Sequence, residues 1–504
     1  MIGEKVLAGN RKMELSLAAT AKRRSMGTKD ACASVLIKAG ICPSGIPTKM
    51  LEKYCAQDVA LTESIFLEQR QELAAMDLLR VFYCRNIVTP ALADIEFNGM
   101  TLDAQRVEET YSEYAQKYSS LEQEFSRLTG GINPKSPKQL AEFIYDKLRF
   151  AELTDHRGEV LKTDTGNPRT DKHTLAALEA TNDEQKAFLK VAKELVKLKT
   201  PLQNLTKMAQ ICKDKPDDPR VFASYNQTVT QTDRLSSTGR NGGFQFHNFD
   251  RAFKRLFRAR TPGGLVCEAD APQLEFRVAA FLGHDPVAKS DIQTGVDVHQ
   301  NTATTLGCSR QHAKSFTFKP LYGGNSGSPS ERRYYKFFRE RYSGIYRAQS
   351  GWTMAVARDK HLTTPWGLRF YWPDTKIQES GYVTNTTQIF NYPIQSFATA
   401  DIIPLCLVLL WHRLGSLGDR AVIVNTIHDS VIAEINPVSL EEYTIHLVEC
   451  FTKDIYELIE KLYGMKIDVP LGVGIKSGEF WGEGPETKHE ALGFCDKHEV
   501  PNGH

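Results

Sequence analysis

The sequence predicts an α+β protein in which a long helical part precedes a part built from short strands and helices. Apolar residues recur at helical spacing through much of residues 1–215, and from about residue 220 the pattern changes to short strands and turns. With 504 residues the chain is too long for one hydrophobic core, so we expect about two to four domains or subdomains.

Charge, cysteine content and hydropathy limit the classes of protein to which the chain can belong. The net charge is only +2, from 63 basic and 61 acidic residues, so a nucleic-acid partner would have to bind local basic faces. The 10 cysteines form no CxxC pair and no zinc-like cluster, which favours reduced thiols in a cytoplasmic protein. We find no run of about eighteen apolar residues and no signal-peptide core, so no membrane span is predicted.

Two long amphipathic helices are predicted before residue 215. From Asp103 to Leu128 apolar residues step by three and four, with Asp103 as the helix N-cap and Gly130 as the stop. A second such helix spans about residues 184–212, with a kink expected at Pro201. Together they predict an antiparallel helical arm. One face of the second helix carries a lysine stripe that suits either solvent or a phosphate backbone: Lys186, Lys190, Lys193 and Lys197.

Two carboxylates fall at predicted strand ends. Residues 265–270 form an apolar strand that ends on Asp270, and residues 421–427 and 431–435 form a hairpin whose tight turn holds Asp429. Two acidic strand ends can share a pair of Mg²⁺ ions, which prefer hard oxygen ligands, and the backbone carbonyl of Ala271 could add another ligand. Such ions, about 3.5–4 Å apart, can activate an attacking hydroxyl and stabilise a leaving pyrophosphate.

A helix predicted over residues 310–322 carries an unusual stripe. Arg310, Lys314, Phe318 and Tyr322 fall every four residues, so they share one slowly drifting face. The two cations match the phosphates of a nucleoside triphosphate, and the two rings offer flat faces to its sugar and base. Phosphoryl transfer requires mostly positioning and charge neutralisation, and this set supplies both.

These segments resemble motifs of the family A DNA polymerases, the bacterial repair and phage replicative type. Asp270–Arg277 is similar to the family's D-x-x-Q-x-E-x-R, Arg310–Gly323 to its R-x3-K-x3-F/Y-x3-Y-G, and His428-Asp429 to its H-D-E turn. Thr232–Ser237 and Asn391–Gln395 match two further segments in the expected order. The resemblance covers roughly residues 95–485.

The resemblance implies a role for each matching residue. Asp270 and Asp429, with the Ala271 carbonyl, would hold two Mg²⁺ ions, for which Mn²⁺ could substitute, and Lys314 would donate a proton to pyrophosphate. Glu275 would lie beneath the sugar and exclude a 2′-hydroxyl. The other implied dNTP contacts are Arg310, Lys314, Phe318, Tyr322, Gln273 and His428. The implied DNA contacts are Arg234, Asn248, Arg277, Asn391, Gln395 and the lysine stripe.

The implied architecture is a right hand with an antiparallel palm sheet. Residues 96–215 would form the thumb, 216–290 and 395–485 the palm, and 291–394 the fingers, followed by a C-terminal tail at 486–504. The implied activity is template-directed DNA synthesis from dNTPs on primer-template DNA. We expect a monomer in the cytoplasm, which would be the host cytoplasm if a phage encodes the protein.

The sequence departs from the family pattern at two positions. Ser430 stands where glutamate is common, so metal affinity or fidelity is expected to differ while activity survives. Pro320 lacks a backbone donor and clashes with the carbonyl of Phe316, which predicts a bent or tightened helix end. Phe318, where tyrosine is the alternative, implies discrimination against dideoxynucleotides.

Residues 1–95 resemble the end of a proofreading 3′–5′ exonuclease domain. Tyr54-x3-Asp58 is similar to the third motif of that nuclease, but its acidic D-x-E pair does not occur in the 53 preceding residues. We expect a truncated, mostly helical remnant that cannot proofread by itself. A separate exonuclease subunit could supply the missing half.

Two other functions remain open. A single-subunit RNA polymerase shares the two aspartates and the Lys/Tyr helix, but Glu275 argues against it because a ribonucleotide enzyme must leave room for the 2′-hydroxyl. A catalytically inactive relative that binds duplex DNA is favoured by Ser430 and the missing exonuclease half. The presence of Asp270, Lys314 and Asp429 opposes it.

Overall fold

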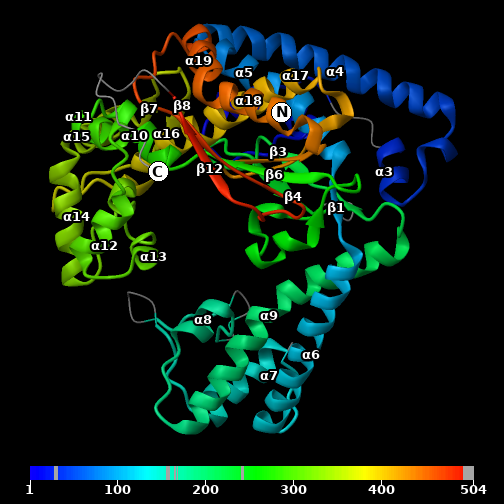
Figure 1. Cartoon of the computed structure of the whole chain (residues 1–504), viewed down its shortest axis with the longest axis vertical. Coiled ribbons are helices and arrows are strands. Elements are labelled where there is room, and N and C mark those ends of the chain that lie inside the picture. The colour runs from blue at the N-terminus through cyan, green and yellow to red at the C-terminus, as the bar shows by residue number, and fades with distance from the viewer. Residues whose placement is uncertain are drawn as a thin grey trace. The chain divides into compact units, whose positions relative to one another are not determined.

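The computed structural model describes residues 1–27, 32–134, 136–154, 159–163, 166, 168–239 and 243–491. The chain forms two compact units (Figure 1). The first comprises Met1–Gly99, Phe222–Phe249 and Thr261–His504, and the second comprises Met100–Val221 and Asp250–Arg260. The structure combines long helices with antiparallel sheets, so the predicted α+β class is confirmed.

The second unit is the predicted helical arm. Helices α6 (Ala104–Thr129) and α9 (Asp183–Asp214) pack side by side (Figure 1), and the Asp103 carboxylate caps α6 by accepting a hydrogen bond from the Arg106 amide at 2.8 Å. Pro201 lies inside α9, and Phe188 of α9 is surrounded by other aromatic rings. The shorter elements are β1 (Met100–Leu102), α7 (Pro137–Ala141), η2 (Glu142–Lys147), α8 (Lys172–Ala177), β2 (Arg220–Val221), η5 (Arg251–Leu256) and β5 (Phe257–Arg258).

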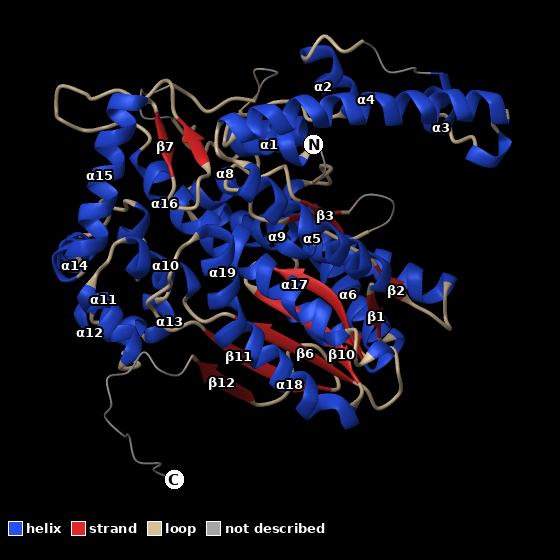
Figure 2. Ribbon diagram, turned by 90° about the horizontal axis from the view of Figure 1, so that it is seen from above, coloured by secondary structure: helices blue, strands red, loops and turns tan. Residues whose placement is uncertain are grey.

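A five-stranded antiparallel sheet forms the centre of the first unit. Its strand order is β12-β11-β6-β10-β9, with bounds Glu486–Glu490, Gly472–Gly478, Leu265–Asp270, Ser430–Ile435 and Ala421–Ile427. All six residues of β10 are buried, because helices cover the sheet (Figure 2). Helix α17 (Ile403–Leu414) packs against β9, and Tyr443 of α18 (Leu440–Glu449) lies against Cys267 of β6. The sequence analysis separates a C-terminal tail from the palm at residue 486, and this is wrong for residues 486–490, since β12 extends the sheet by pairing with β11.

One continuous helical run crosses the core of the first unit. It consists of α16 (Thr386–Ser396), the π-helical turn η7 (Phe397–Ile402) and α17 (Ile403–Leu414). Contrary to the sequence expectation, this run is long and apolar enough to cross a membrane, and it is the one such helix in the described ranges, with a mean hydropathy of 1.7 in its most apolar window. Within the fold 83% of that window is buried, as in the core helix of a globular protein.

The stripe of residues 310–322 does not form the single helix that its periodicity predicts. Helix α13 spans only Arg310–Ala313, and a 3₁₀ turn follows at Pro320–Tyr322. The Phe316 carbonyl accepts the amide of Lys319 at 3.0 Å, because Pro320 has no amide to donate. The predicted tightening at Pro320 is therefore confirmed, and it extends through most of the segment.

The N-terminal helices pack partly onto this core and partly onto one another. They are α1 (Ile2–Ala8), α2 (Leu17–Arg23), α3 (Cys32–Lys38), α4 (Thr48–Ala75) and α5 (Leu79–Asn98). The first unit also contains the α-helices, strands and 3₁₀ turn β3 (Ser224–Asn226), β4 (Ser236–Thr238), η4 (Phe246–Asn248), α10 (Leu274–Leu282), α11 (Pro286–Gln293), α12 (Val298–Leu306), α14 (Pro329–Arg341), α15 (Ser343–Asp359), β7 (His361–Thr363), β8 (Arg369–Tyr371), α18 (Leu440–Glu449) and α19 (Ile455–Tyr463).

A buried ion pair fastens α5 to the core helix. Arg85 of α5 donates to both carboxylate oxygens of Asp401, at 2.5 and 3.0 Å, and the Tyr463 hydroxyl donates to the same carboxylate at 2.6 Å. The side chains of Arg85 and Asp401 are 6% and 0% exposed. Removing one partner would leave a buried charge without compensation, which is far more costly than losing an exposed pair.

We expect Arg85→Met to lower the free energy of unfolding by about 3–5 kcal/mol, because Asp401 would stay buried without its cation. Urea unfolding followed by circular dichroism measures this change. Arg80→Met is the matched control, since Arg80 is an exposed arginine of the same helix and should change stability little. Equal losses of stability in Arg85→Met and Arg80→Met would show that the Arg85–Asp401 ion pair does not stabilise the fold.

Candidate active site

The two predicted carboxylates lie at the ends of adjacent strand segments. Asp270 ends β6, Asp429 lies in the turn between β9 and β10, and Ser430 pairs with Asp270 in the ladder. The Ala271 amide donates a hydrogen bond to the Asp429 carbonyl oxygen at 3.2 Å. The fold thus joins two segments that are far apart in the sequence, directly beside their carboxylates.

The electrostatics of this pair suit a divalent cation. Burial raises the pKa of Asp429 to about 7, the negative charge of Asp270 adds to the rise, and Arg234 opposes it. A cation would remove the repulsion between the two carboxylates, and their oxygen-only donor set suits Mg²⁺ or Mn²⁺. The described part of the chain holds no group of three or more His, Cys, Asp or Glu side chains arranged for a metal ion. Water or substrate phosphates would therefore have to complete the coordination.

Ser430 contacts one of the two carboxylates directly. Its hydroxyl donates a hydrogen bond to Asp270 Oδ1 at 2.8 Å, and its carbonyl accepts one from the Thr426 hydroxyl at 3.1 Å. The residue is buried. At the position where the resemblance implies glutamate, this chain has a neutral hydroxyl that donates to Asp270.

Glu275 lies in the first turn of α10, shortly after the strand end at Asp270. Burial raises the pKa of Glu275, and Arg234 and Gln395 partly offset this rise. The Tyr322 hydroxyl donates a hydrogen bond to the Glu275 carboxylate. The last residue of the stripe is therefore tied to the side chain that is expected to exclude a 2′-hydroxyl. Gln273 precedes α10 in a left-handed conformation, with φ of 52°.

Phe318 makes a second connection between the stripe and α10. Its ring stacks on Phe276 of α10, with centroids 5.5 Å apart and planes at 26°, and it meets His299 edge-on at 5.2 Å. Since α10 follows directly from the Asp270 strand end, one helix links the stripe to the carboxylate pair.

The two cations of the stripe lie near residues that the sequence analysis did not single out. Arg310 Nε donates to Asp297 Oδ2 at 2.7 Å. Burial lowers the pKa of His299, and the positive charges of Arg310 and Lys314 lower it further, while Asp297 opposes them. The available signal was the Asp297-Val298-His299 run at the start of α12, where Asp297 is the N-cap and His299 lies in the first turn.

Arg234 lies beside the carboxylates, on a loop that two side-chain hydrogen bonds hold in place. The Thr232 hydroxyl donates to Gln395 Oε1 at 2.8 Å, and the Thr230 hydroxyl donates to the Arg234 carbonyl at 2.7 Å. Within the described ranges, Arg234 Nε and Asn391 Oδ1 are buried and have no hydrogen-bond partner. Buried polar atoms of this kind call for an explanation, and a bound substrate is one.

His428 occupies the turn residue before Asp429, with φ of 59°. Its ring meets that of His247 edge-on at 5.1 Å, and His247 Nδ1 lies 2.7 Å from the Ser237 hydroxyl. Burial lowers the pKa of His247 to about 3, with smaller effects of His428 and Arg234, so His247 is neutral at physiological pH. His247 is another residue that the sequence analysis left unassigned. Asn248 follows it in η4, and its side chain lies outside the described part of the structure.

Arg277, predicted as a DNA contact, has an internal role in this structure. Its guanidinium donates to the carbonyls of Pro272 and Pro470, at 3.0 and 2.6 Å, and to the Glu490 carboxylate. The side chain is 7% exposed. Arg277 thus ties α10 to the edge strand β12, and we leave it out of the proposed DNA interface.

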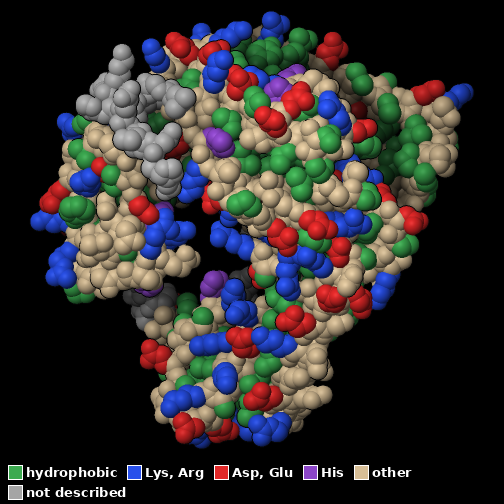
Figure 3. Space-filling model, viewed as in Figure 1, with side chains coloured by type: hydrophobic (Ala, Val, Ile, Leu, Met, Phe, Trp, Pro, Cys, Tyr) green, Lys and Arg blue, Asp and Glu red, His purple; other side chains and the backbone are tan. Residues whose placement is uncertain are grey.

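The lysine stripe lies on α9 of the second unit. Lys186 pairs with Asp183 at 3.2 Å and Lys197 with Glu194 at 3.8 Å, while Lys193 donates to a backbone carbonyl of α8. Lys190 is exposed. Cations and anions are interspersed on the visible face of this arm (Figure 3). The structure describes this unit by itself, so the stripe's relation to the carboxylate pair stays a prediction.

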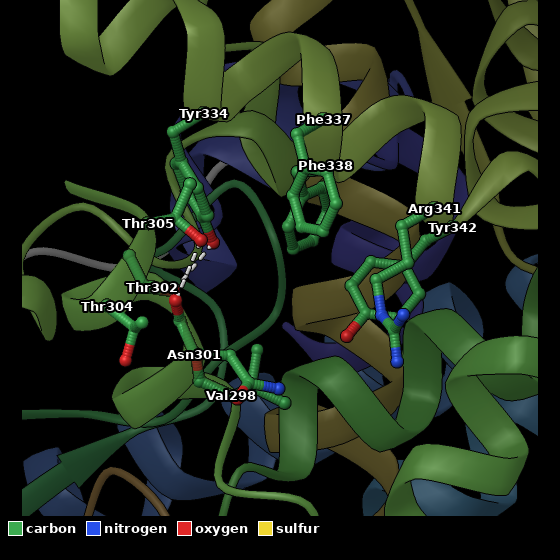
Figure 4. A pocket seen from close by; sticks show the side chains of 10 residues that line it. All are labelled: Val298, Asn301, Thr302, Thr304, Thr305, Tyr334, Phe337, Phe338, Arg341 and Tyr342. Atoms are coloured by element: carbon green, nitrogen blue, oxygen red, sulfur yellow. Dashed lines mark hydrogen bonds between the residues drawn. The ribbon is translucent and has the colours of Figure 1, made fainter.

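A separate cavity of about 230 Å³ lies between α12 and α14 (Figure 4). Threonine and asparagine side chains of α12 form one wall, and aromatic rings of α14 form the other. The Thr302 hydroxyl donates to Tyr334 at 2.9 Å, and Arg341 is held by both carboxylate oxygens of Asp291. None of the predicted site residues lines this cavity, and these polar groups already bond within the protein.

Comparison with known proteins agrees with the resemblance. The model of DNA polymerase family A matches residues 104–483. DNA polymerase I of Rhizobium leguminosarum is 29% identical over 457 residues, which cover 85% of this chain and 43% of the relative. The thermostable DNA polymerase I of Thermus caldophilus is 30% identical over 420 residues, covering 77% of this chain and 46% of the relative. The chain thus spans about half the length of the curated relatives it matches.

A solved structure shares the fold. It is described as the POL domain of Pol1 from M. smegmatis in complex with DNA primer-template and dNTP, and it superposes with a TM-score of 0.73 at 21% identity. The match covers 95% of this chain and 81% of that one. The predicted right-hand polymerase fold is therefore confirmed. Because the family model covers most of the sequence, from residue 104 to 483, the chain belongs to DNA polymerase family A.

Proposed function

We propose that this protein is a template-directed DNA polymerase that adds dNTPs to a primer 3′-hydroxyl and releases pyrophosphate. One observation carries the proposal: the carboxylates of Asp270 and Asp429 lie at adjacent strand ends, and α10 connects them to the Arg310–Tyr322 stripe. The names of the relatives and the DNA-bound state of the structural neighbour support it.

The carboxylate pair is the proposed metal site. Asp270, Asp429 and the Ala271 carbonyl would hold two divalent ions, and Ser430 would keep Asp270 oriented. When bound, such ions lower the pKa of the attacking hydroxyl and neutralise charge on the phosphates. Arg310 and Lys314 contribute the remaining positive charge to the triphosphate, and Lys314 donates the proton that the leaving pyrophosphate requires.

Nucleotide selection follows from the Tyr322–Glu275 contact. Glu275 is fixed by Tyr322 and by burial, so it would stand rigidly beneath the sugar of the incoming nucleotide. A 2′-hydroxyl placed there would clash with it, which favours dNTPs over rNTPs.

The DNA-binding surface is proposed from residues around the carboxylates. Arg234, Asn391, Gln395 and His428 would face the primer terminus, because Arg234 and Asn391 present buried polar atoms without partners among the described residues. The lysines of α9 would contact duplex phosphates, and Asn248 would contribute as the resemblance implies. We retain the thumb, palm and fingers boundaries, the monomeric state and a cytoplasmic location as parts of this proposal.

We further propose that this chain does not excise mismatched primer ends by itself. Tyr54 and Asp58 lie on α4, yet residues 1–53 contain no D-x-E pair. A separate exonuclease subunit would then be the partner that restores proofreading.

Primer extension tests these proposals together. Wild type should extend a matched primer with dNTPs, should use rNTPs far less well, and should not shorten a primer with a mismatched 3′ end. Asp429→Ala should not extend the primer. Wild-type extension that is equally fast with rNTPs would favour the RNA polymerase alternative, and no extension under any condition would favour an inactive DNA-binding protein.

Ser430→Ala should raise the Mg²⁺ concentration needed for half-maximal synthesis by about 10-fold, because Asp270 would lose the donor that orients it. The maximal rate should fall much less. A Mg²⁺ titration of primer extension measures both quantities. Ser439→Ala, another buried serine of this unit outside the site, is the control. An unchanged Mg²⁺ dependence would show that Ser430 does not orient the ligand.

A further inference from the structure

Helix α1 reaches a loop of the proposed active site. Lys5 Nζ lies 3.1 Å from Asp233 Oδ1, and the side chains are 7% and 2% exposed. Lys5 also donates to the carbonyl of Gly9 at 2.7 Å, which directs its ammonium group. Asp233 directly precedes Arg234, so an element outside the region matched by the family model contacts one of the family's motif segments.

Asp233 is costly to bury in this conformation. Its φ of 60° lies in the left-handed region, which non-glycine residues rarely adopt. Burial raises its pKa, and the charges of Lys5 and Arg85 oppose that rise. Arg85 Nε is 3.9 Å from Asp233 Oδ2, while the two terminal nitrogens of the Arg85 guanidinium donate hydrogen bonds to Asp401. Lys5 therefore supplies the cation that balances Asp233. The cluster then holds two cations, Lys5 and Arg85, and two carboxylates, Asp233 and Asp401.

The ion pair fixes the loop that presents Arg234. On one side of Asp233, the Thr232 hydroxyl donates a hydrogen bond to Gln395. On the other side, the carbonyl of Arg234 accepts a hydrogen bond from Thr230. Lys5 holds the residue between these two anchors. The Arg234 guanidinium lies close enough to Glu275 and Asp429 for its charge to affect both, so a shift of this loop moves a cation within the site.

Helix α1 is itself held rigidly. The Asn10 side chain bonds to Tyr371 of β8 through both its amide nitrogen and its oxygen, at 2.9 and 2.6 Å. Gly9 has no room for a side chain, because a Cβ there would lie 2.2 Å from the Arg369 carbonyl. Val6 is part of the main hydrophobic core. The helix that carries Lys5 is thus held in a fixed position relative to Asp233.

We infer that Lys5 is a positioning residue for DNA binding. Through its ion pair with Asp233 it holds Arg234 in position to contact the primer terminus, so α1 contributes to the polymerase site. This inference rests on the proposed function. It assigns to the N-terminal segment a role that the resemblance to an exonuclease remnant does not provide.

The test uses the full chain and steady-state primer extension, well below the melting temperature. Lys5→Met should raise the KM for primer-template by about 10-fold, since a displaced loop weakens the contact, while kcat changes little. Lys12→Met, an exposed lysine of the same segment, should leave both constants unchanged. Lys5→Met in an Arg234→Ala background should raise KM no further, because the same contact is already lost.

A second variant separates positioning from folding. In Lys5→Met/Asp233→Asn no uncompensated charge is buried, so the melting temperature should return toward the wild-type value. KM should stay raised, because the ion pair that holds the loop is still absent. An unchanged KM for Lys5→Met, or effects of Lys5→Met and Arg234→Ala that multiply independently, would overturn the inference even if the melting temperature falls. If wild type extends no primer at all, the proposed function fails instead.

Discussion

Asp429→Asn is expected to abolish DNA synthesis and, in the absence of metal, to stabilise the fold. The first effect follows because the pair of carboxylates would lose one charge, and we expect synthesis to fall by about 10³-fold or more. The second follows because burial and the negative charge of Asp270 both make the ionised form of Asp429 unfavourable. An amide of the same shape removes both penalties.

The stabilisation should depend on pH. The pKa of Asp429 is about 7 in the folded protein, above its value in an unfolded chain, so the protonated form favours folding. That contribution is fully present below about pH 4 and is lost as the pH rises through about 7. In EDTA, wild type should therefore melt below Asp429→Asn at pH 8, and the difference should shrink toward pH 4.

Differential scanning fluorimetry and primer extension together measure these effects. Mg²⁺ at pH 8 should raise the melting temperature of wild type but not that of Asp429→Asn. Asp419→Asn, an exposed carboxylate beyond the other end of β9, is the matched control and should behave like wild type. If Asp429→Asn melted below wild type at pH 8 in EDTA, the two carboxylates would not repel each other.

Lys314→Ala is expected to lower kcat for nucleotide insertion by about 10²–10⁴-fold, the range for loss of a general acid. Lys314 is exposed on the segment that Phe318 and Tyr322 attach to α10, so its ammonium group is free to meet a triphosphate. Lys314→Arg should restore much of the affinity for dNTP but little of kcat, because a guanidinium does not release its proton.

Single-turnover insertion separates these two constants. Lys319→Ala is the control, since Lys319 is a neighbouring exposed lysine that lies 3.6 Å from Glu331 and 4.2 Å from the centre of the Phe316 ring. It should change kcat little. Equal losses in the two alanine variants would mean that charge in this segment matters but that Lys314 donates no proton.

Local patterns predicted most of the fold. Helix α6 and the β9–β10 hairpin begin and end within a residue or two of their predicted bounds, because their apolar periodicity and their cap and turn residues agree. The Arg310–Tyr322 segment was predicted less well. Its period of four is helical, but the missing amide of Pro320 and the bonds between residues three apart make it irregular.

The site was harder to predict, because its decisive contacts join distant segments. Periodicity shows which face of an element is buried but does not identify what packs against it. The pairing of Asp270 with the Asp429 turn was inferred from chemistry and resemblance, whereas Tyr322–Glu275, Arg310–Asp297 and Lys5–Asp233 were not foreseen. Buried charges such as Arg85 also run against the expectation that charged side chains are exposed.

The central claim is that Asp270 and Asp429 together support template-directed nucleotide addition, and single-nucleotide primer extension tests it most directly. Four templates that differ in the templating base are each offered one dNTP at a time with Mg²⁺. Wild type should add the complementary nucleotide on every template, and both Asp270→Asn and Asp429→Asn should add none. Addition that ignores the template, or an unchanged rate in either variant, would contradict the account.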